Sequence, residues 1–411
     1  MSKHGPVLAI IGSAYPTLVA GLRAAGLDSV VESSWTDVPT PFEHMSPAAV
    51  VAAIPSEDGA ALDTLAKRVA AAEPYVPLIV LNAHTSPLPA NAIPFSLTEN
   101  DADRLAARLR AALRVRALHA TMLRRQADRP TASRRFAETD PLQDATVLLI
   151  GRGAAYPTLS VTLGTRTRVV GALSIEAAAK HLNARDIDGI VIGDGFTARV
   201  VDAFLTVLSE DPRFRNLPIV APPGSKHSYD LPNLEMIDGE PIEIVANALP
   251  LIRQRAFEQR INRTLRSIDA GGLLDPRTGL LTPIAFDRDL ETAVDQAHTR
   301  GSSFSAARFS FAESHPRDQY DAARILSRLM RRMDFATMHE DGSMTAVFVD
   351  AGVRNANAIA RRLANVMKYT MHSARRDSHI DPHVRVEMLA ANDTAASLLA
   401  RLARDTSRAA S

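Results

Sequence analysis

Short apolar runs alternate with longer amphipathic stretches along the first two thirds of the chain. Runs such as "VLAIIGS", "AAVVAAIP" and "VPLIVLNAH" are rich in aliphatic and β-branched residues, and Ala/Leu/Arg stretches with helical spacing separate them. Strands that alternate with helices predict βαβ units and a parallel sheet. Two long amphipathic helices are predicted to close such units, over roughly residues 101–125 and 243–268.

The pentapeptide "AYPTL" occurs twice, at residues 14–18 and 155–159, each time directly after an apolar run. The second copy is followed by "IDGIVIGDG" and "LPIVAPP", in the order of the strands that follow the first copy. This internal repeat predicts two units of the same fold. We place the first domain at residues 1–126 and the second at 146–270. The polar stretch 127–145 has no periodicity and is predicted to be a linker.

The last third has a different order of elements. A helix precedes the strand-like "SFSAARFSFAE", and a second helix leads to a predicted hairpin, "DFATMHEDGSMTAVFVD". A further helix, the strand "HVRVEML" and a closing helix follow. This order predicts a third α/β domain over residues 271–411.

Composition limits the classes of function. The 411 residues are 46% hydrophobic and 23% charged, with a formal net charge of +1, which favours neither nucleic acid nor a membrane surface as a partner. Basic residues are mostly Arg, which suits recognition of carboxylate or guanine, although the base composition of a genome can give the same bias. The chain has no Cys, so disulfides and thiolate chemistry are excluded. The apolar run near the start is too short to span a bilayer, so we expect no membrane insertion and a cytoplasmic protein.

The two repeats resemble response-regulator receiver domains, which have this size and this alternation of strands and helices. The resemblance implies flavodoxin-like parallel sheets. A receiver also needs an acidic pair after its first strand to hold Mg²⁺, an Asp after the third to take the phosphoryl group and a Lys after the fifth. In both repeats the acidic pair and the Lys are missing. Asp194 is the one candidate phosphoryl acceptor, and we expect both repeats to be packing or docking surfaces rather than switches.

Residues 270–286, "AGGLLDPRTGLLTPIAF", resemble the entry motif of the GGDEF family, the diguanylate cyclases, and the order of elements resembles that family over the remaining chain. A cyclase holds two metal ions on carboxylates and recognises guanine, because phosphodiester formation depends on positioning and charge neutralisation. The strand that would carry metal ligands reads "ARFSFAES", with no acid before Glu313. The guanine-binding segment is shortened to "SHPRDQYDAAR".

The active-site hairpin of the family is altered as well. The two glycines, which allow close approach to substrate, and the acid after them are replaced here. The corresponding residues are Glu340, Asp341, Gly342, Ser343 and Met344. Because metal, base and guanine elements are all altered, we expect no catalytic residues, no bound metal, no cofactor and no enzyme activity.

Arg331 and Asp334 form an Arg-x-x-Asp motif before this hairpin, where the family has an inhibitory site for cyclic di-GMP. On a helix, residues at i and i+3 share a face, so we expect both to be exposed at a helix end. A guanidinium can fork onto guanine O6 and N7, and a carboxylate can accept from guanine N–H groups. The resemblance adds Arg362, on the helix after the hairpin. For further copies of the motif an ordinary surface ion pair is expected. They begin at Arg125, Arg185, Arg199 and Arg266.

Two receiver-like domains before a degenerate GGDEF domain resemble the layout of PleD-type cyclases, and the retained inhibitory site resembles PopA-type cyclic di-GMP effectors. The resemblance implies an effector at a cell pole that helps to deliver a cell-cycle or replication regulator to the ClpXP protease through adaptor partners. A homodimer is an expected assembly. Two alternatives stay open: a diguanylate cyclase inhibited by its product, and a receiver-type scaffold that binds no nucleotide.

Overall fold

A computed structural model of the chain forms two compact units. The first comprises residues 1–168, 172–175 and 187–261, and the second comprises 169–171, 176–186 and 262–411. The three-domain division stays a prediction. The structure describes residues 6–11, 15–27, 29–35, 46–54, 59–82, 88–97, 101–127, 140–224, 229–300, 303–311, 316–331, 333–370 and 382–403.

Two five-stranded sheets with equivalent strand orders, β2-β1-β3-β4-β5 and β7-β6-β8-β9-β10, lie in the first two thirds of the chain. Apart from residues 169–171 of β7, their strands belong to the first unit. The strand pairs within the two sheets are parallel, which confirms the parallel sheets predicted from the sequence. This is the order of flavodoxin-like folds. The strands are β1 (Val7–Ile10), β2 (Val30–Ser33), β3 (Ala49–Ala53), β4 (Leu78–Leu81), β5 (Ala92–Phe95), β6 (Thr146–Ile150), β7 (Arg168–Ala172), β8 (Gly189–Ile192), β9 (Ile219–Ala221) and β10 (Leu234–Met236).

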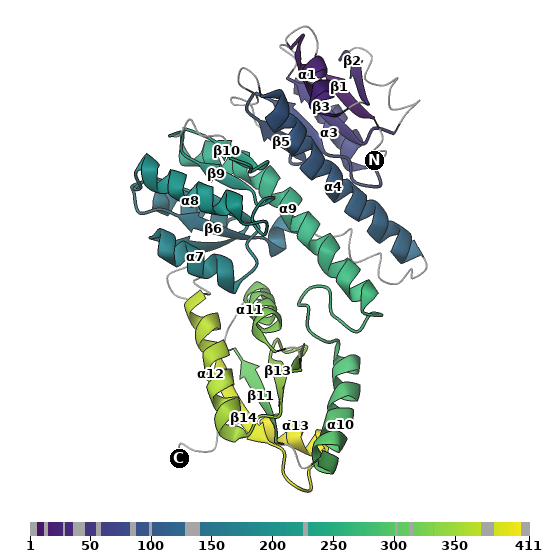
Figure 1. The fold of residues 1–411 in the computed structure, drawn as a ribbon, viewed down its shortest axis with the longest axis vertical. Helices are drawn as coiled ribbons and strands as arrows, with labels where there is room; N and C mark the ends of the chain where they lie inside the picture. Colours follow the sequence, from purple (N-terminus) through teal and green to yellow (C-terminus); the bar gives the residue numbers. More distant parts are fainter. Residues whose placement is uncertain are drawn as a thin grey trace. The chain divides into compact units, whose positions relative to one another are not determined.

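Helices cover both faces of each sheet (Figure 1). In the first sheet, α1 and α4 bury one face and α3 buries the other, because successive strand residues point to opposite faces. The long helices α4 and α9 match the two helices predicted to close the repeats. Part of the predicted linker forms the short helix η2, and residues 128–139 lie outside the described ranges. The helices are α1 (Leu18–Ala24), α3 (Gly59–Ala70), α4 (Ala102–Ala127), η2 (Pro141–Asp144), α6 (Tyr156–Gly164), α7 (Ile175–Ala184), α8 (Ala198–Glu210) and α9 (Pro241–Asp269).

The second unit contains a four-stranded sheet of order β12-β13-β11-β14, in which neighbouring strands are antiparallel. Its strands are β11 (Phe304–Ser310), β12 (Phe335–Met338), β13 (Met344–Val349) and β14 (His383–Met388). Its helices are α10 (Pro283–Arg300), α11 (Pro316–Leu329), α12 (Val353–Thr370) and α13 (Ala395–Ala403). In the described ranges, no helix is both long and apolar enough to cross a bilayer.

Strand alternation divides the core of this sheet between two layers of helices (Figure 1). Ala307 and Phe309 of β11 pack in one cluster with residues of α11 and α12. Phe304 and Ala306 of the same strand point the other way, into a cluster with α10 and α13. The sheet is therefore covered on both faces, and the β12–β13 turn projects from its end beside α11.

Candidate functional site

The turn between β12 and β13 carries the residues that we compared with the hairpin motif of the cyclases, Glu340 to Met344. The N–H of His339 donates to the carbonyl of Ser343 at 2.8 Å, and the N–H of Gly342 donates to the carbonyl of His339 at 3.0 Å. Gly342 has a φ of 78°, in the left-handed region that glycine adopts without strain. A Cβ atom here would also lie 2.1 Å from the side chain of Gln319 on α11. The turn is therefore tight, and α11 packs against it.

Asp341 is engaged on both carboxylate oxygens. Its Oδ1 accepts from the N–H of Ser343 at 2.9 Å and from the hydroxyl of Ser343 at 2.6 Å. Its Oδ2 accepts from Nη2 of Arg308, on β11, at 2.7 Å. Partial burial raises the pKa of Asp341, but the hydrogen bonds from Ser343 and the charge of Arg308 outweigh it and hold the pKa below its ordinary value. The carboxylate is thus ionised and already neutralised by a guanidinium.

The sequence did not single out Arg308 and His339. Arg308 is the second residue of the stretch "ARFSFAES" that we compared with the metal-bearing strand of the cyclases, and strand register places it opposite Thr345. Nε2 of His339 lies 2.8 Å from Oγ1 of Thr345. Burial lowers the pKa of His339, and the nearby charge of Arg308 lowers it further. In the sequence, the available signal for this site was Arg308, the one charged residue of the strand "FSAARFS".

The site has no arrangement typical of a metal centre. Within the described residues, no group of three or more His, Asp or Glu side chains is placed to hold a metal ion. A hard cation such as Mg²⁺ needs several oxygen ligands. At the turn it would compete with Arg308 for Asp341.

Arg331 and Asp334 lie close together, but not on one helix face. Helix α11 ends at Leu329, so both residues belong to the turn that leads into β12, where the N–H of Asp334 donates to the carbonyl of Arg331 at 3.1 Å. Arg331 is exposed, whereas Asp334 is only 9% exposed. The prediction that both lie exposed on a helix end is therefore wrong for the helix and for Asp334.

The carboxylate of Asp334 is fixed from within the sheet. Its Oδ1 accepts from the N–H of Val349, at the end of β13, at 3.1 Å. Burial raises the pKa of Asp334, and the Val349 N–H and the charge of Arg331 oppose this shift. This contact explains the inward position of the side chain, because a buried strand-end N–H needs an acceptor.

Arg362 is exposed on α12 and lines an open cavity of about 540 Å³. Lys180 and Arg361 contribute further positive charge to the cavity, and Ala358 and Val366 contribute apolar surface. All of its lining residues belong to the second compact unit. Arg331 and Asp334 are not among them, so this cavity does not unite the three residues predicted to bind the ligand, and their shared site stays a prediction.

Asp194 lies at the end of β8, where the first unit has its second parallel sheet. Its carbonyl accepts from the N–H groups of Arg152 and Gly153 at 3.2 Å, and its carboxylate Oδ2 lies 3.4 Å from the N–H of Ala155 at the start of α6. Nε of Arg152 donates to the carbonyl of Gly195 at 3.0 Å. Arg152 thus follows β6, the first strand of the second repeat, where a receiver domain has its acidic pair. Whether Asp194 can be phosphorylated stays a prediction.

One further copy of the Arg-x-x-Asp motif is not the surface ion pair that we expected. Arg185 is buried, and its Nη1 lies 3.2 Å from Oδ2 of Asp321 on α11. Asp188 instead accepts from the N–H of Thr146 at 2.9 Å. By contrast, Arg266 and Asp269 are both exposed on α9, which makes that copy a matched control for Arg331.

Comparisons with known proteins complete the description of the site. The sequence matches no model of a protein family and no curated protein. Similar solved structures include the coiled coil and GGDEF domain of DgcB from Caulobacter crescentus in complex with c-di-GMP, with 16% identity, coverage of 35% of this chain and 83% of that chain, and a TM-score of 0.30. A sensory box/GGDEF family protein from Caulobacter crescentus shows 19% identity, coverage of 32% and 92%, and a TM-score of 0.28. The FimX GGDEF domain from Pseudomonas aeruginosa shows 18% identity, coverage of 32% and 88%, and a TM-score of 0.29. Identities and scores this low identify no family, so the function has to be argued from the chain's own residues.

Proposed function

We propose that the C-terminal part of the chain is a degenerate GGDEF domain that binds cyclic di-GMP and does not synthesise it. The observation that carries this proposal is the state of Asp341. Its two oxygens are held by Ser343 and Arg308, whereas synthesis requires carboxylates that coordinate two metal ions. A guanidinium in that position neutralises the carboxylate without polarising a triphosphate.

Binding is assigned to Arg331, Asp334 and Arg362. The exposed guanidinium of Arg331 can fork onto a guanine Hoogsteen edge, and an ionised Asp334 can accept from guanine N–H groups. A carboxylate has about four acceptor positions, so the bond from Val349 leaves capacity for a ligand. Arg362 supplies positive charge for the phosphates of the ligand.

The chain as a whole is proposed to be a cytoplasmic PopA-type effector. In this role it recruits a cell-cycle or replication regulator to a cell pole for degradation by ClpXP, with adaptor proteins as partners. The two parallel-sheet repeats then act as degenerate receivers that dock proteins. This part of the proposal rests on the resemblance of the domain layout alone.

Isothermal titration of the purified chain with cyclic di-GMP tests the binding function. Loss of a bidentate charged partner costs about 1–3 kcal/mol, which is roughly tenfold to a hundredfold in affinity. Arg331→Ala should weaken binding by that factor, and Arg266→Ala, at the exposed copy of the motif, should leave it unchanged. If wild type does not bind cyclic di-GMP, or if both variants lose the same affinity, the effector function is refuted and a scaffold that binds no nucleotide is favoured. Conversion of GTP to cyclic di-GMP by the pure chain with Mg²⁺ would show an active cyclase.

A further inference from the structure

The two repeats of the first unit contact each other reciprocally. Helix α9 of the second repeat packs on the first, where Leu251 joins the core cluster of α4 and the ring of Phe257 lies 5.3 Å from that of Tyr75. Helix α4 of the first repeat in turn contacts β10 of the second through Arg108. The last helix of each repeat thus contacts the other repeat, which is the pattern of a two-fold dimer formed within one chain.

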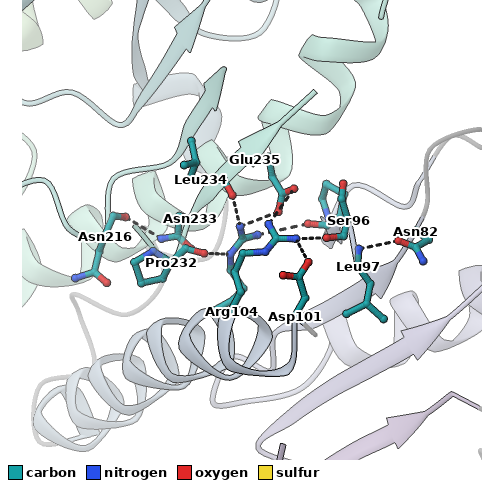
Figure 2. A network of polar contacts seen from close by, with 12 residues as sticks. Asn82, Ser96, Leu97, Asp101, Arg104, Asn216, Pro232, Asn233, Leu234 and Glu235 are labelled. Atoms are coloured by element: carbon teal, nitrogen blue, oxygen red, sulfur yellow. Dashed lines mark hydrogen bonds and ion pairs between the residues drawn. The ribbon is translucent and has the colours of Figure 1, made fainter. Parts of the chain in front are cut away.

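A buried guanidinium lies at the centre of this contact. Arg108 is fully buried, and its Nη2 donates to Oε1 of Glu235 at 2.8 Å and to the carbonyl of Leu234 at 3.3 Å. Its Nε donates to the carbonyl of Pro232. Figure 2 shows Glu235 on its strand facing α4, with Arg104 beside it. Nη1 of Arg104 lies 3.8 Å from Oε2 of Glu235. Burial lowers the pKa of Arg108 and the charge of Glu235 opposes this, so the two side chains depend on each other.

A second buried carboxylate of the second repeat also pairs with a guanidinium of the first. Glu258 of α9 is 3% exposed and pairs with Arg114 of α4, as well as with Arg255 of its own helix at 2.7 Å. At both places the first repeat supplies the guanidinium and the second repeat supplies the carboxylate.

The first repeat has no equivalent of Glu235. Glu235 is the second residue of β10 and lies opposite Val220, whereas the second residue of β5, opposite Ile79, is Ile93. If two first repeats paired through this face, each Arg108 would be buried against an isoleucine. If two second repeats paired, each Glu235 would be buried without a guanidinium. A buried charge that lacks its partner is strongly destabilising.

We infer that Arg108 and Glu235 determine which partner this face accepts. The last helix and strand of a first repeat fit those of a second repeat, in the same chain or in a second copy of it, and like repeats do not pair. The two repeats have the same strand order and would otherwise offer each other equivalent surfaces, so the charges act as the repulsive element that specificity requires. A dimer through this face is then an exchange of repeats between two chains.

Charge reversal in the full-length chain tests this inference. Arg108→Glu and Glu235→Arg should each lower the urea midpoint of unfolding. The double variant should lose less than the sum of the two single losses, because it restores the charge pair with opposite polarity, although a carboxylate at position 108 cannot donate to the carbonyls of Pro232 and Leu234. Co-expression of the two single variants should yield a heterodimer, which light scattering detects. In that heterodimer the carboxylate that Arg108→Glu introduces in one chain pairs with the guanidinium that Glu235→Arg introduces in the other. Reversal of the exposed pair Arg215–Asp230, which is 2.6 Å apart, should leave the midpoint unchanged.

The milder pair Arg108→Gln and Glu235→Gln serves if the reversals do not fold. The inference then requires the double variant to lose less than the sum of the two single losses. Strictly additive losses in both sets would overturn it. Stable dimers formed by either single variant on its own would also overturn it, because like repeats would then pair despite the charges.

Discussion

Replacing Arg308 tests whether its guanidinium keeps divalent cations away from the β12–β13 turn. The side chains of Arg308 and Asp341 are 26% and 56% exposed, with 2.7 Å between Nη2 and Oδ2. Ion pairs this open to water contribute about 0.2–1 kcal/mol. Arg308→Ala should therefore lower the free energy of unfolding by about 0.2–1 kcal/mol in urea denaturation. The turn should persist, because Ser343 still holds Asp341.

Arg308→Asp goes further and places a second carboxylate opposite Asp341. Paired carboxylates attract a hard cation, so this variant should bind Mn²⁺, with an affinity for the turn that wild type lacks. Isothermal titration with Mn²⁺ measures the difference, and the double variant Arg308→Asp/Asp341→Asn should lose it. Two results would refute the reasoning: wild type binding Mn²⁺ as tightly as Arg308→Asp, or a loss above about 3 kcal/mol for Arg308→Ala, which is typical of a broken buried pair.

Three further predictions concern the turn, the ligand and the first repeat. Gly342→Ala should lower the free energy of unfolding by about 1–2 kcal/mol, since alanine is strained at positive φ, and urea denaturation measures this. Binding of cyclic di-GMP should weaken as the pH falls, because burial raises the pKa of Asp334 and the carboxylate takes up a proton at a higher pH than a free Asp does. Titrations at neutral and at acidic pH should show no such dependence for Asp334→Asn. Burial lowers the pKa of His119, whose Nδ1 accepts from the N–H of Tyr75 at 2.9 Å. The unfolded chain then binds the proton more tightly, so stability should fall as the pH drops below about 6.5, and His119→Asn should flatten that dependence.

Local periodicity predicted the elements whose signals are repeated along the chain. The parallel sheets follow from apolar runs in matching order, and the long helices α4 and α9 come within a few residues of their predicted ranges. The hairpin β12–β13 was also predicted, because a Gly-containing turn separates two apolar strands. These features depend on neighbours in sequence, which is the information that a single sequence carries.

The end of α11 could not be predicted in the same way. The helical pattern of Arg and apolar residues continues past Leu329 to Met333, without a Gly or Pro to stop it. In the structure the chain turns there and Asp334 meets the N–H of Val349, 15 residues later. The contact between Arg308 and Asp341 spans 33 residues. Such contacts depend on strand pairing, so local sequence patterns contain no signal for them.

The arginines illustrate the limit of a compositional argument most clearly. A bias toward Arg over Lys is compatible with genome composition, and many of these side chains are exposed. Arg108 and Arg185, however, are fully buried, each beside a carboxylate from a distant element. A guanidinium can donate in several directions at once and stays charged when buried, whereas the single ammonium of Lys loses its proton more readily. At Arg108 the guanidinium serves a carboxylate and three carbonyl groups, including that of Pro94 at 3.5 Å. The geometry of these contacts therefore requires Arg at this position, whatever the origin of the overall bias.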